Sequence, residues 1–221
     1  MKLKHAVQKI CSITALTALF MPFSFLHGEP VESKYKGFTI DESRVRNMAD
    51  LGKILKATKE QIDIVYEVGV PTEILEFFRS VPFILVPSGE ISSGSPGLYG
   101  GKDRSVKVTS KIVTTGHKPV LLHELLHAYH DQKIPQGFNN EDIIQYFKRA
   151  QTIGAYDFKS HMMKNEREFF ACSATSYLFG VTAQEPFKRD KVKDSQPKFF
   201  AHLKALFGQG AGNYVGTLTD K

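Results

Sequence analysis

The chain has 221 residues, of which 42% are hydrophobic and 24% are charged, a balance that is ordinary for a soluble globular protein. This length favours one folded domain with a core of its own, and the composition excludes collagen and a long disordered chain. The formal net charge is +6. Because the basic residues are scattered and form no arginine-rich stripe, the charge does not indicate nucleic-acid binding.

Residues 1–28 are typical of a secretory signal peptide. Three lysines precede an uncharged apolar run of 17 residues that ends at Leu26. Cleavage near Gly28 would leave 26 basic and 23 acidic residues, and Cys172 as the only cysteine. A secreted or periplasmic protein without an internal disulfide is therefore expected. The alternative is an N-terminal segment retained as a membrane anchor, because the run is close to spanning length.

The chain after this segment begins with few structural signals, and residues 29–40 are interpreted as an extended leader. The spacing of apolar residues then predicts three helices, over residues 41–55, 58–69 and 71–80. We therefore divide the rest of the chain into an N-terminal extension with its helix, residues 29–57, and a main domain, residues 58–221.

A small β-sheet is expected next. The run VPFILVP, residues 81–87, is short, apolar and bounded by prolines, which predicts a buried strand. A loop rich in glycine and serine follows at residues 88–101. The alternating segment at residues 104–115 predicts one or two further strands. The sheet would thus directly precede the helix that Pro119 begins.

The remaining elements are predicted to be helical, over residues 140–151, 163–179 and 196–207. The expected fold class is therefore α+β, a mostly helical domain with a small mixed β-sheet packed on the helix that starts at Pro119.

The segment VLLHELLHAYHDQ, Val120–Gln132, carries the clearest chemical signal. A helix places His123 and His127 on one face, about 6 Å apart, where both imidazoles can bind one metal ion. Glu124 lies beside the first histidine and can reach a water held on that ion. This H-E-x-x-H pattern on a helix that follows strands predicts a zinc site. The alternative is a surface helix in which the histidines occur by chance.

A catalytic zinc ion has three protein ligands and one open position, so a third ligand is required. The metzincin class is excluded, because the chain has His130 and Lys133 where that class has glycine and histidine or aspartate. On an uninterrupted helix His130 points along the groove, which predicts a residue at the rim of the site, a residue that supports a metal ligand, or an exposed histidine. The third ligand should be a carboxylate from a second helix. The candidates are Glu141, Asp142, Asp157, Glu166, Glu168 and Glu185.

Glu168 stands out among these candidates, because NEREFFACSATSYLF places it on an otherwise apolar helix. A buried carboxylate is costly unless it has a partner, and a zinc ion is such a partner.

Together, HELLHAYHD and NEREFFACSATSYLF resemble the gluzincin-type zinc metallopeptidases related to the catalytic domain of anthrax lethal factor, including the secreted Pro-Pro endopeptidases. The resemblance extends over about residues 58–207, and only the two helical motifs are specific. It implies a zincin-like fold with one Zn²⁺ ion and with Glu124 as the general base. The ligands that it implies are His123, His127 and Glu168.

Two positions depart from the pattern of that family. The second glutamate of the family's helical motif is Cys172 here, which we expect to pack as a small apolar group or to touch a metal ligand. A tyrosine that stabilises the oxyanion in the family is replaced by His161, and Tyr156 lies a little upstream. We therefore expect His161, or else Tyr156, to take the role of that tyrosine.

These observations predict a monomeric, secreted or periplasmic zinc endopeptidase that hydrolyses a peptide or protein substrate. By analogy, the substrate is expected to add as a strand at Arg104–Val108. One alternative is a non-catalytic metal-binding or partner-binding module with the same fold, which Cys172 and the missing tyrosine favour. Another is a membrane-anchored structural protein with an incidental motif.

Overall fold

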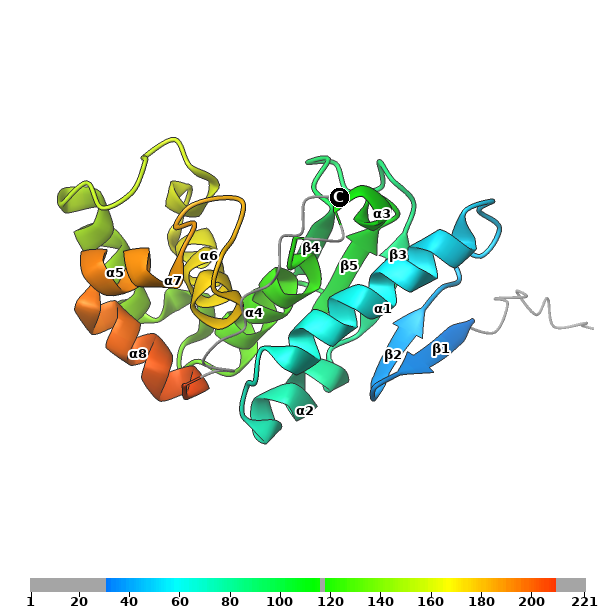
Figure 1. Ribbon diagram of the computed structural model, residues 1–221, viewed down its shortest axis with the longest axis horizontal. Coiled ribbons are helices and arrows are strands. Elements are labelled where there is room, and N and C mark those ends of the chain that lie inside the picture. Colours follow the sequence, from blue (N-terminus) through cyan, green and yellow to red (C-terminus); the bar gives the residue numbers. More distant parts are fainter. Residues whose placement is uncertain (1–30, 116–117, 210–221) are drawn as a thin grey trace, which may run out of the picture.

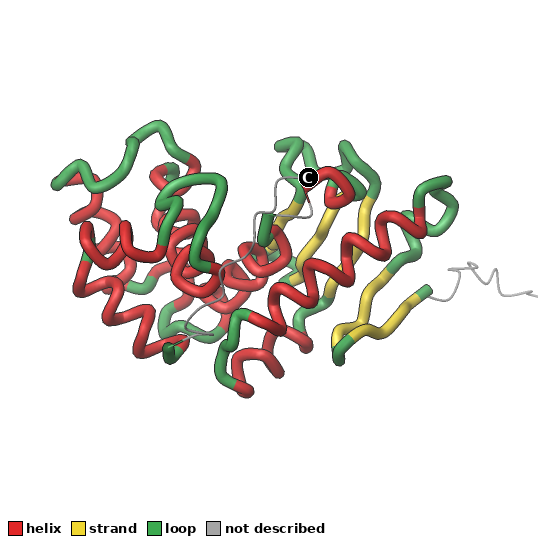
Figure 2. The backbone as a smooth tube through the Cα atoms, in the orientation of Figure 1, coloured by secondary structure: helices red, strands yellow, loops and turns green. Residues whose placement is uncertain are grey.

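The computed structural model describes residues 31–115 and 118–209, so the expected signal peptide lies outside the described residues. Within those ranges the fold is α+β, as predicted, with one mixed five-stranded sheet and a larger number of helical residues (Figures 1 and 2). In the same part of the chain, no helix is both long and apolar enough to cross a membrane.

The sheet has the strand order β1-β2-β3-β5-β4. Its strands are β1 Glu32–Tyr35, β2 Phe38–Asp41, β3 Phe83–Val86, β4 Gly97–Gly100 and β5 Ser105–Thr109. The three central strands β2, β3 and β5 are parallel, and each outer strand is antiparallel to its neighbour. Because β5 is the one described strand that pairs with β4, β4 forms an edge of the sheet.

One helix, α4, lies between the sheet and a group of C-terminal helices (Figure 1). It packs against α6, α1, β4 and β5. The helices are α1 Leu51–Glu67, α2 Thr72–Ser80, α3 Ile112–Thr115, α4 Val120–Gln132, α5 Glu141–Thr152, α6 Glu166–Phe179, α7 Arg189–Ser195 and α8 Pro197–Phe207, with 3-10 turns η1 Gly137–Asn139 and η2 His161–Met163. The histidine-bearing helix therefore lies at the centre of the molecule.

The prediction for the N-terminal segment was wrong. Residues 32–41 form a hairpin of β1 and β2, whose two-residue turn has φ values of 46° at Lys36 and 84° at Gly37. Positive φ at both central residues suits the right-handed twist of paired strands. Since β2 also pairs with β3, the hairpin belongs to the main sheet.

The helix expected at residues 41–55 begins only at Leu51, and it continues without a break into the one expected at residues 58–69, so both belong to α1. The Thr58 hydroxyl donates to the carbonyl of Ile54, one turn earlier, and does not cap a new helix. The boundary expected after residue 57 therefore falls inside α1.

One expectation for the middle of the chain was also wrong. The loop expected at residues 88–101 contains β4, which its glycines concealed because only two of its four residues carry side chains. The alternating segment at residues 104–115 contains one strand, β5, as predicted, and the helical turn α3 follows it. The helix expected from Met163 begins at Glu166, and η2 precedes it.

The start of α4 is held by a side chain from α1. Gln61 Nε2 donates to the carbonyl oxygen of Lys118 over 2.8 Å, and Gln61 Oε1 accepts from the backbone N–H of Leu121 over 3.0 Å. The second bond satisfies a backbone N–H that a helix start leaves without a partner inside the helix. Gln61 therefore helps to fix the position of the first turn of α4.

Candidate metal centre

His123 and His127 project from one face of α4 toward the beginning of α6. Their Nε2 atoms are 3.1 Å apart, and the rings meet edge to face with centroids 4.7 Å apart. The two side chains are 13% and 9% exposed, so water has limited access to them. The i, i+4 spacing thus brings two imidazole nitrogens together, as the sequence predicts.

Glu168 reaches this histidine pair from the first turn of α6. Its Oε2 atom lies 3.2 Å from Nε2 of His123 and 3.3 Å from Nε2 of His127. The side chain of Asn165 caps the helix, because its Oδ1 accepts from the backbone N–H groups of Arg167 and Glu168. Among the candidate carboxylates on described residues, Glu168 is the one found in a cluster suited to a metal ion.

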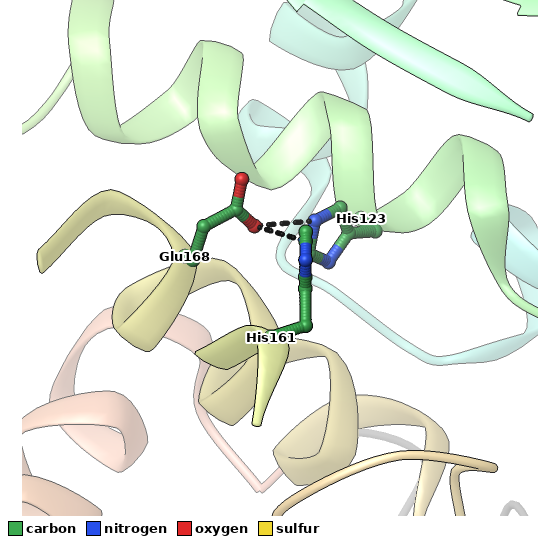
Figure 3. Close-up of side chains that lie close together, drawn as sticks. All are labelled: His123, His161 and Glu168. Atoms are coloured by element: carbon green, nitrogen blue, oxygen red, sulfur yellow. Dashed lines mark hydrogen bonds and ion pairs between the residues drawn. The ribbon is translucent and has the colours of Figure 1, made fainter. Parts of the chain in front are cut away.

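His161, on the turn η2, faces the same carboxylate oxygen. Its Nε2 atom lies 2.9 Å from Oε2 of Glu168. Figure 3 shows His161 and His123 pointing at this oxygen from two different elements. The ligand atoms of His123, His161 and Glu168 all lie within 4.8 Å of one another. The expectation that His161 belongs to the site therefore has a geometric basis.

These side chains are suited to a zinc ion. Tetrahedral zinc with bonds of about 2.0–2.1 Å to nitrogen or oxygen separates its ligand atoms by about 3.3–3.4 Å. The three separations within His123, His127 and Glu168 are 3.1, 3.2 and 3.3 Å. A neutral imidazole has a single N–H, so two facing Nε2 atoms share one proton at most. A cation among these atoms would give each nitrogen a partner.

The carboxylate of Glu168 is held in its charged form. Burial acts to raise its pKa, but hydrogen bonds with His123, His127 and His161 outweigh burial and bring the pKa well below its usual range. A deprotonated carboxylate is the form that binds a metal ion.

Glu124 is the second carboxylate at this centre, and it is only 8% exposed. Its Oε2 atom accepts a 2.7 Å hydrogen bond from the backbone N–H of Tyr99 on β4. Burial raises the pKa of Glu124 to about 7, and the charge of Glu168 acts in the same direction. A carboxylate that exchanges its proton near neutral pH is suited to general base catalysis.

Gly97 allows β4 to lie directly against α4 at this carboxylate. A Cβ atom at Gly97 would lie 2.8 Å from Cγ of Glu124 and 2.8 Å from Cγ1 of Val120. Gly97→Ala is therefore expected to displace Glu124 and to lower the free energy of unfolding by about 1–3 kcal/mol. Urea denaturation measures the change.

Gly101→Ala is the matched control, because its Cβ would make only an ordinary contact, 3.8 Å from Phe138. Equal stabilities of the two variants would contradict the role assigned to Gly97.

Two cavities adjoin the cluster, and His123, Glu124 and His161 line both. One, of about 330 Å³, extends toward Pro96, Thr175 and Gln184. The other, of about 360 Å³, lies between β4 and the start of α6 and is bordered by Lys164 and Arg167. A chain that crosses the centre would thus have space on either side of it.

Neither Cys172 nor Tyr156 belongs to the cluster of His123, His161 and Glu168. Cys172 is 2% exposed, and its Sγ accepts a 3.6 Å hydrogen bond from Nε2 of Gln184. Burial raises the pKa of the Cys172 thiol, so it is a buried thiol one turn beyond Glu168. Tyr156 is 6% exposed and packs against Phe169 in the core. Of His161 and Tyr156, only His161 lines the cavities.

The expectation of an exposed or rim position for His130 was wrong. His130 is fully buried, and its ring lies 5.1 Å from that of Phe138 and 4.7 Å from that of Phe170. The reason is tertiary: α6 and η1 cover the face of α4 that the isolated helix would leave open. His130 is therefore a core residue.

The burial of His130 predicts sensitivity to acid. Burial lowers its pKa from 6.5 to about 3, so between these values the unfolded chain binds a proton that the folded chain does not. This group should lower the free energy of unfolding by about 2 kcal/mol between pH 7 and pH 5. Urea denaturation in the presence of EDTA measures the loss, which should be smaller in His130→Phe. Identical pH dependence in the two proteins would refute this assignment.

Two contributions to the site were absent from the sequence predictions. Asn165 could have been found, since asparagine before a helical acidic turn is a preferred N-cap. Tyr99 acts through its backbone N–H, so its side chain carries no signal of that role.

The centre thus belongs to the class of sites in which two histidines and a carboxylate from two helices converge beside a second buried carboxylate. Comparison of the chain with models of known protein families, with curated proteins and with solved structures gives no match.

Proposed function

We propose that this protein is a secreted or periplasmic zinc-dependent endopeptidase of the gluzincin type, acting on a peptide or protein substrate. The observation that carries the proposal is the convergence of His123 Nε2, His127 Nε2 and Glu168 Oε2, at separations of 3.1–3.3 Å, beside the carboxylate of Glu124. His123, His127 and Glu168 would hold one Zn²⁺ ion.

Zinc bound there would supply Lewis acidity, polarising a peptide carbonyl and lowering the pKa of water to about 7. Glu124 is the residue suited to take the proton from the attacking water and to return it to the leaving amine. The backbone N–H of Tyr99 orients the carboxylate of Glu124 for this task. His161 has an imidazole on the same centre that can donate a hydrogen bond to the substrate oxygen as negative charge develops there.

The strand of the protein beside which an extended substrate would bind is β4. The earlier expectation of strand addition at Arg104–Val108 was wrong, because β5 is paired on both sides, with β3 and with β4. The N–H of Tyr99 points away from β5, toward Glu124. In an antiparallel ladder residues alternate in the side they face, so Gly97 faces the same side as Tyr99. The N–H of Tyr99 is taken by Glu124, which leaves the backbone groups of Gly97 and the carbonyl of Tyr99 for a substrate. A substrate bound there would run past Glu124.

A second candidate function is a non-catalytic module that holds a metal ion. The position of His161 favours it, because a third imidazole nitrogen so near Glu168 could act as a fourth ligand and close the coordination of the ion. Closed four-ligand sites are typical of structural zinc.

Cleavage of a peptide library by the zinc-loaded full-length protein separates these candidates. The endopeptidase should bind one zinc ion per chain, cleave a subset of peptides, lose activity with a chelator and recover it with added zinc. Stoichiometric zinc without cleavage would favour the non-catalytic module. The absence of stoichiometric zinc would rule out both.

A further inference from the structure

His161 contributes a third imidazole nitrogen to a centre that already has two histidines and a glutamate. Its Nε2 atom approaches Oε2 of Glu168 to 2.9 Å, closer than either His123 at 3.2 Å or His127 at 3.3 Å. The Nε2 atoms of all three histidines thus surround one carboxylate oxygen.

Hydrogen bonding alone accounts poorly for this arrangement. A carboxylate offers about four lone-pair sites over its two oxygens, so a single oxygen is suited to about two donors. Here three imidazole nitrogens lie within 3.3 Å of Oε2 of Glu168. Nε2 of His123 and Nε2 of His127 also face each other at 3.1 Å. A shared metal ion removes this excess of donors, because each nitrogen then gives a lone pair to the ion.

The backbone of His161 is anchored, whereas its side chain is accessible. Met162 is fully buried and Met163 is 8% exposed, so η2 is fixed next to α6. The backbone N–H of Lys164 donates to the carbonyl of His161 and closes the turn. The His161 side chain is 34% exposed, compared with 13% for His123. The imidazole can therefore rotate toward solvent without unfolding the turn.

We propose that His161 is a fourth protein ligand of the metal ion, which closes the centre in the absence of substrate. The inference rests on the metal site proposed above. A substrate carbonyl can reach the ion only when the imidazole of His161 leaves the ion, and the cavities that His161 lines offer space for that movement. The released imidazole can then donate its hydrogen bond to the substrate oxygen. His161 thus regulates access to the centre.

The test compares the wild-type full-length protein with His161→Ala and His161→Phe. His161→Phe keeps an aromatic ring without a nitrogen ligand, so it separates loss of ligation from loss of packing. His202→Ala is the matched control, because it removes a histidine that packs against Tyr146 and Phe199, away from the cluster.

Zinc affinity is measured by competition with a chelating dye, and circular dichroism verifies folding. Both His161 variants should bind zinc at least about tenfold more weakly than the wild type. Even residues that only support a metal ligand change the metal affinity by about 10–100-fold when they are replaced. His202→Ala should retain wild-type affinity.

The cobalt-substituted proteins are titrated with azide, and visible absorption reports anion binding to the metal. If the imidazole of His161 is off the metal less than a tenth of the time, the wild type should need at least about a tenfold higher azide concentration than His161→Ala for the same change in absorption.

Equal zinc affinity and equal azide dependence in wild type and both His161 variants would overturn the inference and leave the endopeptidase proposal intact. A wild-type protein that binds no zinc would overturn both. Cleavage of peptides by wild type together with weaker zinc binding in the variants would support both.

Discussion

Glu124→Gln is expected to reduce peptide cleavage by about 10²–10⁴-fold, the contribution of a positioned general base. Glutamine has nearly the same shape and can still accept the hydrogen bond from Tyr99, but it cannot take a proton from water. Since Glu124 is not among the proposed ligands, the zinc content should stay at one ion per chain. The measurements are the cleavage rate of a peptide selected from the library and metal analysis of the same preparation.

Glu141→Gln is the control for this substitution. Glu141 is an exposed residue in the first turn of α5, so its neutralisation should leave the cleavage rate unchanged. Cleavage by Glu124→Gln at the wild-type rate would rule out this residue as the base.

Glu168→Ala is expected to abolish stoichiometric zinc binding. The substitution removes the carboxylate that His123, His127 and His161 all face, and leaves three imidazoles without their anionic partner. The loss of affinity should exceed the 10–100-fold that is typical for a residue that only supports a ligand, so roughly 100-fold is a lower bound. Competition with a chelating dye measures the affinity, and cleavage should disappear with the metal.

Glu166→Ala provides the matched control, because Glu166 lies in the same first turn of α6 but pairs with Arg167. It should bind zinc as the wild type does. If Glu168→Ala retained the wild-type zinc content, the third ligand would have to be another residue.

Cys172 should be replaceable without loss of the metal. Its Sγ accepts a hydrogen bond from Gln184 and is not part of the cluster around Glu168. Cys172→Ala is therefore expected to keep wild-type zinc affinity and to lose some stability, because a small cavity forms in the core. Zinc competition and urea denaturation check the two parts. Loss of zinc from Cys172→Ala would instead make the thiol a ligand.

Several parts of the structure followed from local rules that a sequence contains. The helices α5 and α8 appear within a residue of their expected bounds, since Asn140 caps one and Pro197 begins the other. The pairing of His123 with His127 needs only the geometry of one helix. By contrast, β1, β2 and β4 were missed, because strands of four residues show too little alternation to be recognised without their partners.

The sequence by itself determined the α+β class, the two histidines and the adjacent Glu124, all of which depend on residues within a few positions of one another. Tertiary structure decided that Glu168 and His161 meet them, that β4 forms the edge beside the centre, and that His130 is buried. The physical reason is that these features depend on contacts between segments far apart in the chain. Such contacts form when α4, α6 and the sheet bury their apolar faces together.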